Sequence, residues 1–275
     1  MALLDPRESF EALSGDPAGA IDLGRAALLV AAEEYPGLDL EGYLSRLDEL
    51  AEQVAGRLEG QPEAQRAVLL NRFLFREQGF VGNAESYYDP RNSFLNEVLD
   101  RRRGIPITLC VVYLEVARRV DLPAWGVGFP GHFLTRVGAA GTVVDPFHGR
   151  VLSESDCAEL LESTAGPAAR LVPRIHLRAS TPREILARLL GNLKQLYLRD
   201  RDFGRALGCC ERILLLLPDA PQELRDRGLV YEQLECFSAA CADLARFLEL
   251  APQDATAEVV RQRLHALRAQ VQRLH

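Results

Sequence analysis

The feature that most constrains the fold of this chain is an internal repeat in its C-terminal third. Six pairs of identical residues recur at one offset of 34 positions: Tyr197 and Tyr231, Phe203 and Phe237, Ala206 and Ala240, Leu214 and Leu248, Leu216 and Leu250, and Pro218 and Pro252. A period of this length is typical of stacked helix pairs, in which each pair buries its apolar face against the next. The stretch from Thr256 to Val271 is then expected to be a capping helix over the last apolar face.

The repeat resembles the tetratricopeptide repeat (TPR), which has an aromatic residue in the first helix, a small residue early in the second and a proline after it. Two copies and a capping helix predict an all-α region over residues 179–275. The sequence departs from the usual Leu-Gly of the first helix in both copies, where it has Leu193-Lys194 and Arg227-Gly228.

The residues before the repeats predict an α+β domain over 1–178. Residues 1 to 78 carry apolar side chains at three- and four-residue steps, which predicts a helical layer. A helix from Pro106 to about Val120 has an apolar stripe that indicates burial. Three further segments are expected: a helix over 94–102 capped by Ser93, a helix over 155–161, and an irregular stretch over 165–178. Alternating segments predict an antiparallel sheet with strands at 124–129, 133–137, 142–144 and 151–152.

Charge and composition exclude several classes of protein. The net charge of −7 disfavours a nucleic-acid binder, and the one basic run is Arg101 to Arg103. The longest apolar run, Ala26 to Ala32, is far shorter than the ~20 residues of a membrane-spanning helix. The N-terminus has no signal-peptide pattern, so we expect a cytoplasmic protein without membrane contact.

The six cysteines show no metal-ligand or redox spacing, and we expect them to be reduced. No phosphate-binding loop of the type Gly-x-x-x-x-Gly-Lys-Ser/Thr and no His-Glu-x-x-His stands in the chain. The sequence therefore predicts neither a metal nor an organic cofactor.

The order of motifs between Gly104 and Asp145 is informative. A buried helix opens with Gly104-Ile105-Pro106, and His132 begins a strand. Asp145 ends the next strand and is followed by Pro146. This order resembles the transglutaminase-like (papain-related) core, in which a Cys begins the central helix. The resemblance implies a thiol activated at a helix N-terminus, a His that accepts its proton and a carboxylate that orients the His.

A closer resemblance is to the SirB-type transglutaminase-like/TPR proteins of bacteria, and it covers about residues 20 to 255. Five motifs carry it: Tyr87–Leu99, Arg103–Leu109, Tyr113–Arg119, Gly126–Leu134 and Val144–Phe147. The resemblance implies the fold class: a helical N-terminal layer, a transglutaminase-like core with an antiparallel sheet, and an all-α TPR region.

The chain departs from the enzymes of this superfamily at the nucleophile. Counting back from the helix exit at Asp121-Leu122-Pro123 puts the expected Cys at Pro106, which has no nucleophilic atom. Cys110 is four residues further on, about 6 Å along a helix, and is a weak replacement. His132 and Asp145 would then be a remnant pair without a thiol.

Polar residues are unusually frequent in the loop 83–97. Asn83, Asp89, Asn92, Asn96 and Glu97 could satisfy buried backbone groups of the loop. Alternatively, Asn92, Asn96 and Glu97 could line a cleft near His132 together with Pro106. The sequence leaves both interpretations open, and it indicates only a loop position for His148.

Three functions are compatible with these features. The preferred hypothesis is a non-catalytic interaction or regulatory scaffold, which binds a protein partner through its TPR region or its degenerate cleft. The alternative is a cysteine hydrolase or amide-transferring enzyme that uses Cys110, His132 and Asp145. A third hypothesis, suggested by the family's name, is a regulator of gene expression that acts through a protein partner without contacting nucleic acid directly.

Overall fold

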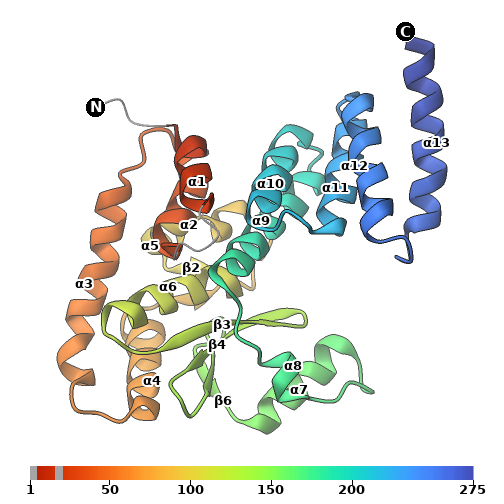
Figure 1. The fold of residues 1–275 in the computed structure, drawn as a ribbon. Helices are drawn as coiled ribbons and strands as arrows, with labels where there is room; N and C mark the ends of the chain where they lie inside the picture. The colour runs from red at the N-terminus through yellow and green to blue at the C-terminus, as the bar shows by residue number, and fades with distance from the viewer. Residues whose placement is uncertain (1–4, 16–20, 275) are drawn as a thin grey trace. The chain divides into compact units, whose positions relative to one another are not determined.

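The computed structural model describes residues 5–15 and 21–274 (Figure 1). The chain divides into two compact units, Met1–Leu186 and Ala187–His275, and the division falls inside helix α9 (Pro182–Arg199). In the described part of the chain, no helix combines the length and the apolar character needed to cross a lipid bilayer.

Helices dominate the first part of unit 1. Their apolar positions recur at helical spacing, as in α3, where Leu44, Leu47, Leu50, Val54 and Leu58 are all buried. The predicted helical layer is therefore confirmed for the described residues, and a π-helical turn at Phe73–Glu77 ends it. The helices are α1 (Pro6–Ser14), α2 (Leu23–Ala32), α3 (Leu40–Leu58) and α4 (Glu63–Arg72).

Helix α6 (Pro106–Arg119) is the centre of unit 1, and every residue from Pro106 to Ala117 is buried. It packs against α2, α3 and the first strands of the sheet. Its one buried charge, Glu115, pairs with Arg118 at 3.0 Å and with Arg119 at 2.5 Å. Helix α2 approaches so closely that a Cβ atom on Gly24 would lie 2.8 Å from the Glu115 carboxylate.

The sheet is antiparallel with strand order β3-β4-β5-β6, as the sequence predicted (Figure 1). Helix α7 (Glu154–Ala165) packs on it through Cys157 and Leu161, which join Val127, Phe129 and Leu134 in one buried cluster. The strands are β3 (Ala124–Phe129), β4 (His132–Val137), β5 (Thr142–Asp145) and β6 (Arg150–Leu152).

The tight turn between β3 and β4 fixes where the second strand begins. Phe129 pairs with His132 across a two-residue loop, and Gly131 has a φ of 66°, a left-handed conformation that glycine adopts at little cost. His132 is therefore the first residue of β4 and stands at the end of the sheet.

Two local expectations are corrected by the structure, and one strand pairing was not expected. Ser93 does not cap the short helix α5 (Leu95–Arg101), because it belongs to a 3₁₀ turn at Pro90–Ser93 and Phe94 takes the cap position. The stretch 165–178 contains a short helix, α8 (Pro173–His176). A two-residue parallel pairing joins β1 (Val81–Gly82) to β2 (Arg103–Gly104), which no sequence period could indicate.

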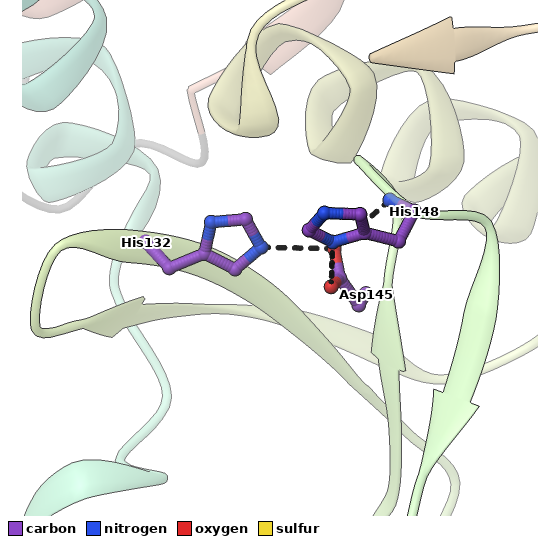
Figure 2. Close-up of side chains that lie close together, drawn as sticks. All are labelled: His132, Asp145 and His148. Atoms are coloured by element: carbon purple, nitrogen blue, oxygen red, sulfur yellow. Dashed lines mark hydrogen bonds and ion pairs between the residues drawn. The ribbon is translucent and has the colours of Figure 1, made fainter. Parts of the chain in front are cut away.

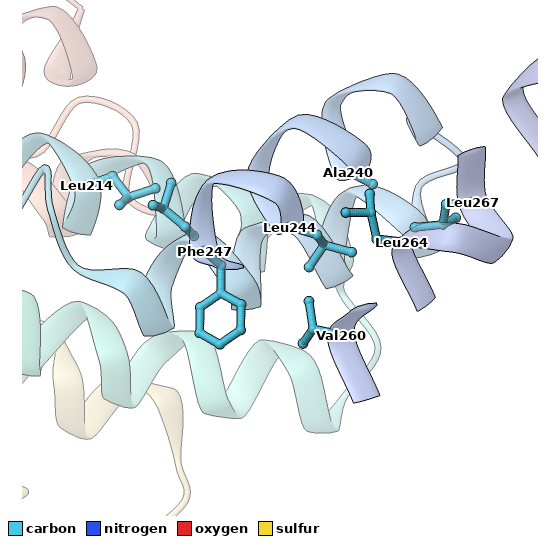
Figure 3. Close-up of a cluster of buried hydrophobic side chains, with 8 residues drawn as sticks. Leu214, Ala240, Leu244, Phe247, Val260, Leu264 and Leu267 are labelled. Atoms are coloured by element: carbon cyan, nitrogen blue, oxygen red, sulfur yellow. The ribbon is translucent and has the colours of Figure 1, made fainter. Parts of the chain in front are cut away.

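In unit 2 the consecutive helices from Phe203 onward pack pairwise, as the 34-residue period requires. The small residues Ala206 and Ala240 are both fully buried. Figure 3 shows the cluster in which Leu244 and Phe247 meet Val260 and Leu264 of the capping helix. The helices are α9, α10 (Phe203–Leu216), α11 (Pro221–Gln233), α12 (Phe237–Leu250) and α13 (Ala257–Leu274).

At both positions where the chain departs from the repeat pattern, the unusual residue forms an ion pair. Lys194, 3% exposed, lies 2.7 Å from Glu223 and 2.7 Å from Asp226 on α11. Arg227 binds both carboxylate oxygens of Asp243, at 2.6 and 2.9 Å. Burial alone would lower the pKa of Lys194, but the hydrogen bonds and charges of Asp226 and Glu223 outweigh it and raise the pKa above 10.5.

Replacing Lys194 should destabilise the helical repeats. Lys194→Met leaves Glu223 without its cation and Asp226 with Arg225 alone, and breaking a buried pair in this way costs about 3 kcal/mol. Urea denaturation of the full chain at pH 7 measures the loss. Because the folded-state pKa of Lys194 is raised, the stabilisation is present at this pH and is lost only as the pH rises through that pKa.

The matched control is Arg246→Ala, since Arg246 and Glu249 form a pair that is 52% and 64% exposed. Such surface pairs contribute at most about 0.5–1 kcal/mol. Adding Glu223→Gln and Asp226→Asn to Lys194→Met should recover much of the loss. Equal stability of Lys194→Met and the wild type would contradict the proposed role of the pair.

Candidate functional site

The carboxylate of Asp145 is the centre of the site in unit 1. Asp145 is the last residue of β5, and its side chain is fully buried. Its Oδ1 atom accepts hydrogen bonds from the backbone amides of Phe147 and His148, at 3.0 and 3.2 Å. The turn that follows β5 therefore folds back over the carboxylate and fixes its position.

Two histidines share this carboxylate. His132 Nε2 lies 2.9 Å from Oδ1, and His148 Nδ1 lies 2.6 Å from Oδ2. In Figure 2 the rings of His132 and His148 both turn toward Asp145. Burial alone would raise the pKa of Asp145, but the hydrogen bonds and charges of His132 and His148 prevail and hold that pKa below its ordinary value of 3.8.

His148 is the residue that sequence reasoning missed, since only a loop position was expected for it. Its side chain is 50% exposed, whereas that of His132 is 8% exposed. The sequence did contain an indication of its role, the spacing Asp145-x-x-His148 directly after a strand. A turn of this length brings the side chain of the third residue back to the residue at the strand end. Among the described residues, His132, Asp145 and His148 form a group in which one possible ligand atom from each residue lies within 4.8 Å of the others.

Cys110 lies apart from these side chains. Its sulfur is 3.1 Å from Thr135 Oγ1 and 3.6 Å from the carbonyl oxygen of Leu134. Thr135 is three residues beyond His132, about 10 Å along the strand. Within residues 5–15 and 21–274, no hydrogen bond joins Cys110 to His132. Complete burial raises the pKa of the Cys110 thiol to about 12, against a smaller opposing effect of the Thr135 hydrogen bond.

Pro106 occupies the first turn of α6 and is buried. Proline suits this position because its missing N–H would have no partner within the helix. Thr108 Oγ1 accepts a hydrogen bond from the Ile105 amide at 3.1 Å and donates one to the Asn92 carbonyl at 2.7 Å. The side chain of Thr108 therefore caps the N-terminus of the central helix and links it to the polar loop by a hydrogen bond.

The polar loop residues Asn83 and Asn92 hold the loop itself. Asn83 Nδ2 donates to Asn92 Oδ1 at 3.0 Å, and Asn92 Nδ2 donates to the carbonyl oxygens of Ser86 and Tyr87. Asp89 accepts from the Arg91 amide and guanidinium. These contacts are of the kind expected if the loop's polar residues satisfy backbone groups.

Asn96 and Glu97, at the start of α5, have different surroundings. Among the described residues, the Oδ1 atom of Asn96 is buried and has no hydrogen-bond partner. Burial, together with the charge and hydrogen bond of Glu97, raises the pKa of Tyr35 to about 12. In the part of the chain that the structure describes, neither residue is hydrogen-bonded to His132 or Asp145, and their role as cleft-lining residues stays a prediction.

A run of aromatic rings borders the histidines. Phe147 lies 6.0 Å from His132 and 6.1 Å from Tyr87, and Tyr87 lies 5.4 Å from Tyr88, measured between ring centroids. Tyr88 is 64% exposed and Tyr87 is 40% exposed. The histidine pair thus stands beside an aromatic surface that reaches solvent.

The comparisons with known proteins agree with this architecture. A profile described as the transglutaminase-like superfamily matches residues 41–191, and a tetratricopeptide-repeat profile matches residues 193–265. A UPF0162 protein of Xylella fastidiosa is 42% identical over 250 residues, 88% of each chain. A UPF0162 protein of Vibrio cholerae is 34% identical over 90% of this chain and 93% of its own. Protein SirB1 of Salmonella typhimurium is 30% identical over 85% of this chain and 87% of its own. The chain therefore belongs to the transglutaminase-like superfamily, in the bacterial family of SirB1 and the UPF0162 proteins, and it carries tetratricopeptide repeats after its core.

Proposed function

We propose that this protein is a non-catalytic scaffold that binds protein partners through the aromatic surface beside His132, where the sequence predicts a degenerate cleft, and through its TPR helices. The observation that carries the proposal is the absence of a usable thiol beside His132 in the described residues. Pro106 stands at the start of the central helix, and Cys110 is buried against Thr135. A His–Asp pair cannot form an acyl-enzyme without a nucleophile within hydrogen-bond reach.

The aromatic surface supports the binding role. Exposed tyrosines supply a large contact area at small cost in side-chain entropy, and they are enriched at protein interfaces. Tyr87 and Tyr88 stand at the edge of the histidine site with Phe147 behind them. A docked partner would therefore cover the tyrosines and His148 together.

The TPR region offers a second surface. In unit 2 a groove of about 410 Å³ is lined by Leu198 of α9, Arg225 and Leu229 of α11, and Arg263 of α13. Arg225 is paired with Asp226 at 2.8 Å and Arg263 with Glu232 at 2.6 Å, so the groove combines an apolar floor with neutralised polar edges, which suits an extended peptide segment. We also place the protein in the cytoplasm, a reducing compartment in which its six cysteines would stay thiols.

The alternative is a cysteine hydrolase or amide-transferring enzyme that uses Cys110. The specific observation in its favour is the hydrogen bond between His132 Nε2 and Asp145, because it leaves Nδ1 of the ring for a thiol. The reactivity of Cys110 separates the two proposals.

Cys110 should resist alkylation in the folded protein. With a pKa of about 12, only about one thiol in ten thousand is ionised at pH 8, and the sulfur is also out of reach of solvent. Brief treatment with iodoacetamide and peptide mass spectrometry should show labelling of the exposed Cys236 and none of Cys110. The guanidinium-unfolded protein, in which both cysteines should react, is the control. Selective labelling of Cys110 ahead of Cys236 would favour the enzyme.

Partner capture should depend on the two surfaces. The tagged full chain is compared in native extracts with Tyr88→Ala, which alters the cleft edge, and Leu229→Arg, which blocks the groove. Each variant should capture about tenfold less of a specific set of proteins than the wild type, which is the effect of removing one interface hot spot. His132→Ala should also weaken capture through the cleft. Arg246→Ala, an exposed change outside both surfaces, is the control, and identical captured sets for all variants would refute the scaffold.

A further inference from the structure

The group formed by His132, Asp145 and His148 has a property that a scaffold does not need. One ligating atom from each residue, two imidazole nitrogens and a carboxylate oxygen, lie within 4.8 Å of one another. We propose that these three side chains bind a divalent transition-metal ion of the Zn²⁺ or Co²⁺ type.

The donor set decides the class of ion. Two imidazoles and one carboxylate suit Zn²⁺, Co²⁺ and Ni²⁺, whereas Mg²⁺ and Ca²⁺ prefer oxygen ligands alone. Three protein ligands also leave a tetrahedral ion with one open position. Because His148 is 50% exposed, this position faces solvent and is open to water or to a side chain of a docked partner.

The site is largely arranged in advance. The amides of Phe147 and His148 hold the Asp145 carboxylate, and both histidines already direct a nitrogen at it. The ion would take the place of the protons now shared between these nitrogens and oxygens. With metal–ligand distances of about 2.0–2.1 Å, ligand atoms stand ~3.4 Å apart, so the half-exposed His148 must move by about 1 Å.

One neighbouring charge opposes the ion. Arg150 Nε lies 4.0 Å from Asp145 Oδ2, and its side chain is 52% exposed. Because its side chain is long and half-exposed, Arg150 can swing out toward solvent when a cation binds, which takes its charge away from the site. Arg150→Gln should therefore tighten metal binding, which a purely structural hydrogen-bonded triad would not show.

The test uses the full chain after removal of metals with a chelator. Zn²⁺ is titrated by calorimetry, and Co²⁺ is followed by its visible absorption. We expect one ion per chain, with at least about tenfold weaker binding in His148→Ala, since even indirect partners of metal ligands contribute ~10–100-fold. His148 is a half-exposed turn residue, and circular dichroism verifies that the variant folds.

Two matched variants locate the ion. His265→Ala removes an exposed histidine of α13, and Cys236→Ser removes the exposed thiol; both should leave the affinity unchanged. No stoichiometric binding, binding unaffected by His148→Ala, or binding lost in Cys236→Ser would each overturn the inference.

The inference shares side chains with the proposed cleft, but its test needs no partner. Metal binding that depends on His148 would stand even if partner capture failed, and capture that depends on Tyr88 would stand if no ion bound. The two proposals therefore fail separately.

Discussion

The burial of helix α6 is the constraint on which the core depends. Since every residue from Pro106 to Ala117 is enclosed, each side chain on it must be apolar or fully paired. Glu115 forms ion pairs with Arg118 and Arg119. Thr108 is hydrogen-bonded to Asn92 in the polar loop, and Cys110 is hydrogen-bonded to Thr135. The burial that stabilises the helix also makes Cys110 a poor nucleophile, because it raises the pKa of the thiol.

The histidine site has a different physical basis. It lies where strands end, and there the backbone amides after β5 turn inward to a buried carboxylate. The hydrogen bonds and charges of His132 and His148 outweigh the effect of burial on this carboxylate and hold its pKa low. The motif residues of the core therefore divide into those that hold α6 and those that gather around Asp145.

The repeats show how a pattern can be kept while its residues change. The usual small residue is replaced by Lys194 in one repeat, and the usual leucine by Arg227 in the other. Each cation finds carboxylates on a neighbouring helix. Ion pairs thus replace part of the apolar contact between helices, and the alanines at the close approaches remain buried.

The sequence by itself determined the helical layer, the antiparallel sheet and the TPR helices, because each rests on a local period or on a repeat at fixed spacing. It also placed Asp145 at a strand end and His132 at a strand start. Only the tertiary structure decided that His148 joins them, that Thr135 occupies the Cys110 thiol, and that Asn83 and Asn92 bond within their own loop. These contacts depend on side-chain direction at turns and strand ends, which periodicity does not encode; they are settled when distant segments meet and every buried polar group must find a partner.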